Sequence, residues 1–148
     1  MEIERKWLVD KSKVVPQLKI GVRIEHYYLN TINDEWLIFA KRLGSFCLLS
    51  LKSQGLMSME ELDYEITEEE YEETIKHAVK SICKSRFYLV IDEDKDQYYN
   101  IDVYDNYDFI TCEVKFNSEI ESLSFVPADW CVEEVTDNPN YMNVILPK

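Results

Sequence analysis

The chain of 148 residues has the length of one domain of ordinary size. Its 16 basic and 29 acidic residues give a formal net charge of −13, which argues against a general nucleic-acid or anionic-membrane binder, because such proteins bind through a basic face. The hydrophobic content of 46% excludes a disordered chain. We therefore interpret residues 1–148 as a single folded domain.

The beginning of the chain lacks the features of a secretion signal. The opening Met1-Glu2-Ile3-Glu4 has neither a basic start nor an apolar stretch behind it, so we expect a cytoplasmic location. The apolar runs are short throughout, which predicts no membrane span. The cysteines are widely spaced and lie beside apolar residues, which indicates buried free thiols. They are Cys47, Cys83, Cys112 and Cys131.

Short runs rich in Ile, Val, Tyr, Phe and Leu recur along the chain, with turn residues such as Asn33-Asp34 and Gly44-Ser45 between them. Each run has the length and composition of a β-strand. The predicted strands are Glu2–Val9, Val22–Leu29, Glu35–Leu43, Ser45–Lys52, Met59–Ile66, Lys84–Ile91, Tyr98–Tyr104 and Phe109–Phe116.

One helix is clear from the sequence. Thr67 is a suitable N-cap, acidic residues follow it at the positive end of the helix dipole, and apolar residues then recur at helical spacing as far as Ile82. Shorter helices are expected near Pro16–Lys19 and Asn140–Leu146. About eight consecutive strands with one long helix predict a mainly β protein whose antiparallel sheet closes or nearly closes.

Charged and apolar residues alternate along several predicted strands. Residues two apart in a strand share a face, so Glu2, Glu4 and Lys6 lie together. The same rule groups the charged residues of other strands: Glu61, Asp63 and Glu65; Lys84 and Arg86; Glu113 and Lys115. Two interpretations stay open. The charges face solvent on a half-solvated sheet, or they line an interior where acids and bases together hold a metal–polyphosphate complex.

The opening Glu2-Ile3-Glu4-Arg5-Lys6 resembles the ExExK motif that begins the CYTH family, also called triphosphate tunnel metalloenzymes. Further runs resemble the family's motifs in the same order along the chain. They are Tyr28-Leu29, Leu49–Lys52, Glu61–Ile66, Lys84–Phe87, Ile101–Tyr104, Cys112–Val114, Asp129-Trp130 and Glu134–Asp137. The resemblance implies an α+β, mainly β fold, with an eight-stranded antiparallel closed β-barrel as a triphosphate tunnel and helices packed outside. It also implies a bound Mg²⁺ or Mn²⁺ ion, and the charged face then becomes the tunnel lining.

The resemblance assigns roles to residues of the charged face. The candidate catalytic residues are Glu4, Glu2 and Lys84. The candidate substrate-binding cations are Lys6, Lys41, Lys52, Arg86 and Lys115. The candidate metal ligands are Glu2, Glu4, Asp63, Glu65, Asp102 and Glu113. Carboxylate oxygens suit a hard divalent cation, while arginine and lysine suit phosphate oxygens.

The chain departs from the family pattern in three places. The third strand carries R-x-R in the family, but neither register of Phe39–Arg42 puts two bases on one face unless a bulge re-aims one of them. Lys115 replaces the second acid of an E-x-E strand, and Asn140 stands where a base is expected before Tyr141. Two readings are open: Lys115 supplies the charge of one metal ion, or the second metal and the hydrolysis are lost.

Three functions follow from these observations. The first is a divalent-metal-dependent hydrolase of inorganic tripolyphosphate or a nucleoside triphosphate. The alternative is a degenerate, weakly active or non-catalytic tunnel that binds a phosphorylated ligand. An adenylate cyclase ranks third, because nothing in the sequence identifies an adenine pocket. The expected partner is a triphosphate or other polyphosphate small molecule, with no nucleic acid and no membrane, and a homodimer is left open by the exposed tyrosines.

Overall fold

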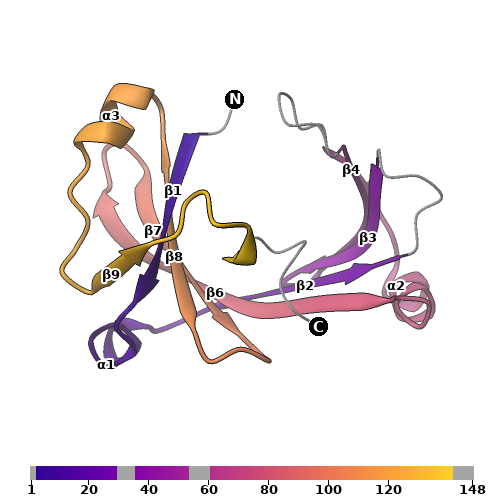
Figure 1. Ribbon diagram of the computed structural model, residues 1–148. Helices are drawn as coiled ribbons and strands as arrows, with labels where there is room; N and C mark the ends of the chain where they lie inside the picture. The colour runs from indigo at the N-terminus through magenta and orange to yellow at the C-terminus, as the bar shows by residue number, and fades with distance from the viewer. Residues whose placement is uncertain (1–2, 30–35, 54–60, 142–148) are drawn as a thin grey trace. The chain divides into compact units, whose positions relative to one another are not determined.

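The computed structural model describes residues 3–29, 36–53 and 61–141 (Figure 1). The strands are β1 (Ile3–Val9), β2 (Val22–Tyr28), β3 (Trp36–Leu43), β4 (Phe46–Ser53), β5 (Glu61–Glu65), β6 (Lys80–Asp92), β7 (Gln97–Tyr104), β8 (Ile110–Phe116) and β9 (Cys131–Glu134). The helices are α1 (Lys11–Val14), α2 (Glu68–Ile75) and α3 (Glu119–Ser124), with 3₁₀ turns η1 (Val15–Gln17) and η2 (Pro139–Tyr141). Each predicted strand therefore has a counterpart, with ends shifted by a few residues.

The strands form a nine-stranded sheet in the order β5-β4-β3-β2-β6-β7-β8-β1-β9. In the described part of the chain, β5 and β9 stand at the two ends of this order and do not pair, so the predicted closed eight-stranded barrel is wrong. The physical reason lies at β1, whose two edges are both occupied, one by β8 and the other by β9. The extra strand β9 therefore takes the edge that closure through β1 would need.

The chain divides into two compact units, one from Met1–Val22 with Ser85–Pro147 and the other from Arg23–Lys84. Strand β6 contributes residues to both. The single domain over residues 1–148 remains a prediction. Among the residues described, no helix has the length and apolar character that a membrane span requires.

The core of the first unit lies on one face of β1, β7 and β8. Its buried members alternate in sequence with the charged residues of the same strands, as a strand period of two requires. The cluster comprises Trp7, Val9, Val14, Ile101, Ile110, Cys112, Val114, Phe116 and Trp130. Val14 comes from α1, and Phe125, which follows α3, packs against the cluster. The apolar face is therefore covered, and the charged residues of these strands, apart from Arg5, lie on the opposite face.

In the second unit, α2 packs on the face of β3 and β4 that carries Ala40 and Cys47, and Tyr71 is buried there. Thr67 caps α2 as predicted, in a capping box with Glu70. The strands β3 and β4 form a hairpin whose turn includes Gly44, with a φ of 59° that residues with a Cβ rarely adopt.

The prediction that the helix continues to Ile82 is wrong, since α2 ends at Ile75 and Ile82 lies in β6. The Val79 N–H donates to the Tyr28 carbonyl at 2.9 Å, so the chain has entered sheet pairing by that residue. The residues Ile75, Ala78, Val79 and Ile82 have helical spacing, but pairing with a distant strand overrides this local pattern.

The remaining sequence predictions have mixed outcomes. The helix expected near Pro16–Lys19 is the shorter turn η1, and the one expected at Asn140–Leu146 overlaps η2 and otherwise lies outside the described residues. Helix α3 was not predicted. All the cysteines are free, as predicted, but only two of them are buried while the others are half-buried. The buried ones are Cys47 and Cys112, and the half-buried ones are Cys83 and Cys131.

Truncation of the first unit's core gives a test of this packing. Ile101 has no exposed surface, so Ile101→Ala is expected to lower the free energy of unfolding by about 2–5 kcal/mol through lost burial and a residual cavity. Ile120 is 79% exposed on α3, so the matched change Ile120→Ala is expected to stay within about 0.5 kcal/mol. Urea unfolding measures both variants, and equal losses would contradict the assigned core.

Candidate functional site

The face of β1, β7 and β8 opposite the core carries charged and polar side chains, and we call it the polar face. Its residues are Glu4, Lys6, Asn100, Asp102, Thr111, Glu113 and Lys115. In the register, Glu4 pairs with Lys115 and Lys6 with Glu113. Directly opposite residues of antiparallel strands share a face with Cβ atoms about 5 Å apart. Glu4 and Glu113 therefore each have a base opposite and another base two residues along the same strand.

An ion pair between the half-buried Arg86 and the buried Asp102 extends the polar face toward β6. Arg86 donates from Nε to Asp102 Oδ1 at 2.7 Å and from Nη2 to Asp102 Oδ2 at 2.9 Å. Burial of the guanidinium lowers the pKa of Arg86, but the hydrogen bond to Asp102 and the charges of Asp102 and Glu113 raise it by more. Arg86 therefore stays charged, and the predicted metal ligand Asp102 has both carboxylate oxygens bound to it.

Lys6 lies between the polar face and the C-terminal segment. Its Nζ donates to the backbone carbonyl of Tyr141 at 2.6 Å, and its backbone N–H donates to Thr136 Oγ1 at 3.1 Å. The side chain is half-buried beside Glu113 in the register. A backbone carbonyl thus holds the ammonium of this predicted phosphate ligand at one end of the polar face.

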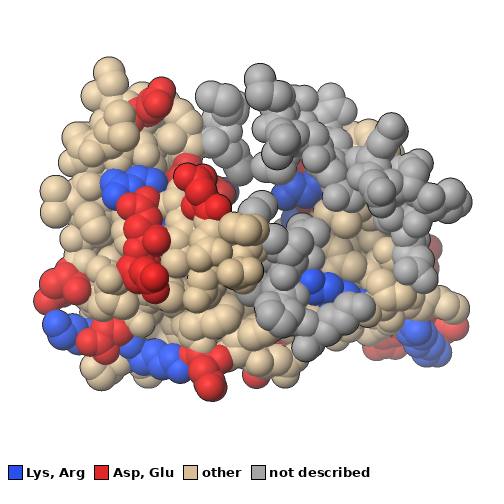
Figure 2. Space-filling view, viewed as in Figure 1, with Lys and Arg blue, Asp and Glu red and all other residues tan. Residues whose placement is uncertain are grey.

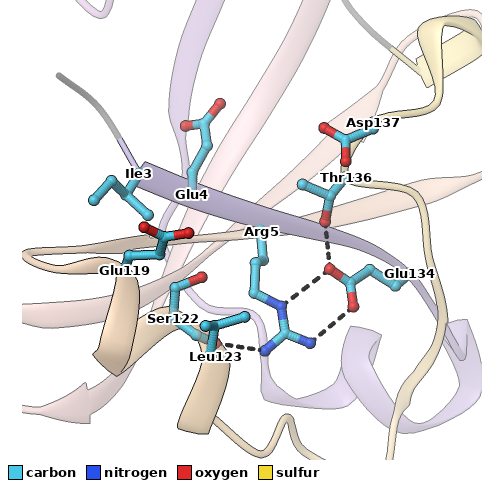
Figure 3. A pocket seen from close by; sticks show the side chains of 9 residues that line it. All are labelled: Ile3, Glu4, Arg5, Glu119, Ser122, Leu123, Glu134, Thr136 and Asp137. Atoms are coloured by element: carbon cyan, nitrogen blue, oxygen red, sulfur yellow. Dashed lines mark hydrogen bonds and ion pairs between the residues drawn. The ribbon is translucent and has the colours of Figure 1, made fainter.

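Arg5 points away from the polar face. Figure 3 shows Glu4 and Arg5 leaving β1 on opposite sides. The guanidinium of Arg5 donates to both carboxylate oxygens of Glu134, at 3.0 and 2.8 Å, and to the carbonyls of Ser122 and Phe125. Arg5 therefore joins β1 to β9 and to α3. The alternation of the sequence already placed it opposite Glu4, but its partners are more than a hundred residues away.

An open pocket of about 680 Å³ surrounds Arg5. Its lining residues are Ile3, Glu4, Arg5, Glu119, Ser122, Leu123, Glu134, Thr136 and Asp137. Figure 2 shows the acidic side chains of this region gathered around one basic group over β1, β9 and α3. Since the one arginine is already paired with Glu134, the pocket is acidic and is unsuited to a polyanion.

The second unit carries its own mixed-charge face on β3, β4 and β5. Lys52 pairs with Glu61 in the register, and Lys41 Nζ lies 3.7 Å from Glu61 Oε1. Ser50 is buried between the strands and donates to Asp63 Oδ1 at 2.6 Å. Glu65 is exposed at the end of β5. The predicted cations and carboxylates of this unit therefore share one face of its sheet.

The register question at Phe39–Arg42 has a definite answer in the structure. Phe39 and Lys41 lie on the mixed-charge face, where Phe39 packs against His26 and Tyr28 with ring centroids 5.0 and 5.3 Å apart. Arg42 lies on the α2 side and forms ion pairs with Glu25 and Glu68. An aromatic residue therefore occupies the position at which the family pattern has a base.

The other predicted residues are placed as follows. Lys84 is 3% exposed in β6, two positions before Arg86. Asn140 is exposed in η2, and Glu2 lies outside the described residues. Within residues 3–29, 36–53 and 61–141, no group of three or more His, Cys, Asp or Glu side chains is placed to hold a metal ion. The predicted metal-ligand set therefore remains a prediction.

No protein-family model matches the chain. The chain is 28% identical over 149 residues to an inorganic triphosphatase of Nitrosomonas europaea, an alignment that covers 98% of this chain and 95% of the relative. The crystal structure of the inorganic triphosphatase NE1496 matches with a TM-score of 0.74 and 25% identity over 97% of this chain and 91% of that one. These likenesses support the resemblance to the CYTH family that the sequence motifs indicated.

A more distant solved structure shares the fold. A candidate adenylate cyclase of Bacillus halodurans has a TM-score of 0.57 and 16% identity over 87% of this chain and 94% of that one. In this chain, Glu4 and Lys6 of the opening motif lie together on the polar face, while Arg5 between them stabilises the other side of β1. The opening motif therefore supplies charged side chains to the polar face and, through Arg5, a contact that stabilises the fold.

The Arg86–Asp102 pair gives a prediction about stability. Asp102 is 4% exposed, so Asp102→Asn leaves the Arg86 guanidinium without its carboxylate and is expected to cost about 3 kcal/mol of unfolding free energy. The double variant Asp102→Asn with Arg86→Gln removes both charges and is expected to be more stable than Asp102→Asn alone. A double-mutant cycle by chemical unfolding measures the coupling, and purely additive effects would contradict it.

The Arg5–Glu134 pair gives a prediction about pH. The Arg5 guanidinium lowers the pKa of Glu134 below its ordinary value of 4.5. A lowered folded-state pKa stabilises the protein above pH 4.5, and this contribution is lost as the pH falls through the lowered pKa. The melting temperature of Glu134→Gln is therefore expected to lie below that of wild type at neutral pH. The difference between the two melting temperatures is expected to shrink as the solution becomes acidic. The control Glu133→Gln makes the same charge change at an exposed neighbour, and a similar closing gap there would contradict the assignment.

Proposed function

We propose that the protein hydrolyses triphosphate-containing substrates, inorganic tripolyphosphate or a nucleoside triphosphate, on the polar face. The near end-to-end likeness to an inorganic triphosphatase supports this proposal. The observation that carries it is the register of β1 and β8, which alternates Glu4, Lys6, Glu113 and Lys115 as acids and bases on one face. Such a surface has carboxylates for a cation and cations for phosphate oxygens within one side chain's reach of each other.

The cations of the polar face would hold the phosphate chain. Lys6 and Lys115 lie diagonally across β1 and β8, and each can contact phosphate oxygens as a point charge. Arg86 is held by Asp102, so its guanidinium is fixed in orientation and contributes positive charge at the β7 side. In the second unit, Lys41, Lys52 and Lys84 remain predicted phosphate ligands.

The carboxylates Glu4 and Glu113 fit a divalent cation. They occupy the other diagonal of the same two strands, and Mg²⁺ is commonly held by one or two carboxylates together with substrate phosphates and water. A bound Mg²⁺ or Mn²⁺ would neutralise negative charge on the phosphate chain. The further predicted ligands are Glu2, Asp63, Glu65 and Asp102.

In the proposed reaction, a water oxygen attacks the terminal phosphorus in line with the bridging P–O bond. That bond breaks, and the products are orthophosphate and the shortened phosphate chain. Lys6 and Lys115 would stabilise the negative charge that develops on the leaving oxygen, which is the main catalytic contribution available in phosphoryl transfer. Glu4 is exposed on the polar face, and we assign it or Glu2 to position the attacking water.

A binding protein without turnover is the second candidate, and the position of Phe39 favours it. Phe39 occupies the mixed-charge face where the family pattern has a base, and Arg42 is bound to acids on the opposite side. Lys115 and Asn140 are the other departures from the pattern. The adenylate cyclase ranks third. The homodimer and the cytoplasmic location remain predictions.

Phosphate release from tripolyphosphate and ATP, with and without Mg²⁺ or Mn²⁺, decides between hydrolysis and binding. Glu113→Gln is expected to lower kcat by about 100-fold, because it removes one of the two carboxylates that would hold the divalent cation on the phosphate chain. Lys6→Met is also expected to lower kcat, because it removes a cation that stabilises the charge developing on the leaving oxygen.

The control is Lys76→Met, which removes a cation that is 66% exposed on the α2 side and pairs with Glu73. It is expected to leave turnover unchanged. If wild type releases no more phosphate than Glu113→Gln under any of these conditions, hydrolysis is excluded and the binding function is retained.

A further inference from the structure

Four aromatic rings form a cluster at the β7–β8 turn. The ring of Phe109 lies centrally, with its centroid 5.4 Å from Tyr104, 5.4 Å from Tyr107 and 5.1 Å from Tyr141. Tyr107 and Phe109 are stacked at an interplanar angle of 29°. The cluster lies entirely within the first unit and has no role in the proposed hydrolysis.

The cluster continues directly from the polar face. Tyr104 follows Asp102 by two positions on β7, and its hydroxyl lies 3.2 Å from Thr111 Oγ1. Phe109 comes directly before β8, and its ring contacts that of Tyr104. At the other edge, the Tyr141 carbonyl accepts from Lys6 Nζ at 2.6 Å. The rings therefore lie where the row of acids and bases ends.

One ring of the cluster is buried, and the other three are partly exposed to solvent. Tyr104 is 4% exposed and forms the base of the cluster, whereas Tyr107, Phe109 and Tyr141 are half-buried. At about 3.4 Å per residue, the four residues from Glu113 back to Phe109 span about 14 Å. An elongated ligand with its phosphates beside Glu113 and Lys6 would place its far end at these rings.

We propose that the cluster of Tyr104, Tyr107, Phe109 and Tyr141 is a binding subsite for the aromatic ring of a nucleoside triphosphate. The proposal rests on the proposed function and specifies its substrate class. A nucleobase gains affinity by stacking on aromatic side chains, and this gain does not depend on which hydrogen-bonding groups the nucleobase carries. Inorganic tripolyphosphate has no ring that could stack. The subsite would therefore favour a nucleotide over tripolyphosphate and leave the identity of the base weakly selected.

The test compares two ligands on variants of Tyr107. Calorimetry in Mg²⁺ measures Kd for the slowly hydrolysed β,γ-imido analogue of ATP and for imidotriphosphate, which has no ring. Tyr107→Leu keeps an apolar side chain but removes the π-face, so it is expected to weaken the ATP analogue by about tenfold and to leave imidotriphosphate unchanged. Tyr107→Phe keeps the ring and is expected to bind both ligands as wild type does.

Tyr64→Leu is the matched control, because Tyr64 is 55% exposed on β5 and lies on the opposite face from Asp63. It is expected to change neither Kd. Equal weakening of both ligands in Tyr107→Leu, or no change in either, would overturn the ring subsite. Failure of hydrolysis in the phosphate-release assay would overturn the proposed function instead, because the binding ratio does not depend on turnover.

Discussion

The two-residue period of β1 is the constraint on which the rest of the first unit depends. Glu4 and Lys6 face one side of the strand, and Arg5 and Trp7 face the other. A shift of pairing by one residue would bury the first pair and expose the second. Burial of Trp7 and the hydrogen bonds of Arg5 to Glu134 oppose such a shift, because both require the present register. The chemistry of the polar face is therefore maintained by contacts on the opposite side.

Local patterns in the sequence predicted most of the elements but not how the sheet ends. The strands β1 to β8 follow from β-branched and aromatic runs, and Thr67 with its following acids marks the start of α2. The strand β9 was missed, because Cys131–Glu134 has two acids in four residues and pairs through a distant partner. The closed barrel was inferred from the number of consecutive strands and from the resemblance, but strand order depends on long-range pairing, which periodicity does not contain.

In the candidate site, too, local patterns predicted some features and long-range contacts decided the others. Alternation placed Glu4 with Lys6 and Glu113 with Lys115, and the register then brought these pairs together. It could not predict that Asp102 binds Arg86, since the two residues lie on different strands. The hydrogen bond from Lys6 to the Tyr141 carbonyl could not be predicted from the residue types either, because every residue has a backbone carbonyl. Sequence therefore predicts the face of a charged residue more readily than its partner.

A protein with a net charge of −13 can still bind a polyanion, because charge acts locally in salt solution. The Debye length is about 10 Å at 0.1 M ionic strength, so exposed acids farther away than this are largely screened. The pocket around Arg5 is acidic, and its one guanidinium is paired with Glu134, so it would repel phosphate. On the polar face, Glu4 and Glu113 each have a base opposite, and a divalent cation held by these two carboxylates would make the balance of the four side chains positive. Whether a polyanion binds the polar face or the pocket around Arg5 therefore depends on the arrangement of neighbouring charges and not on the net charge of the protein.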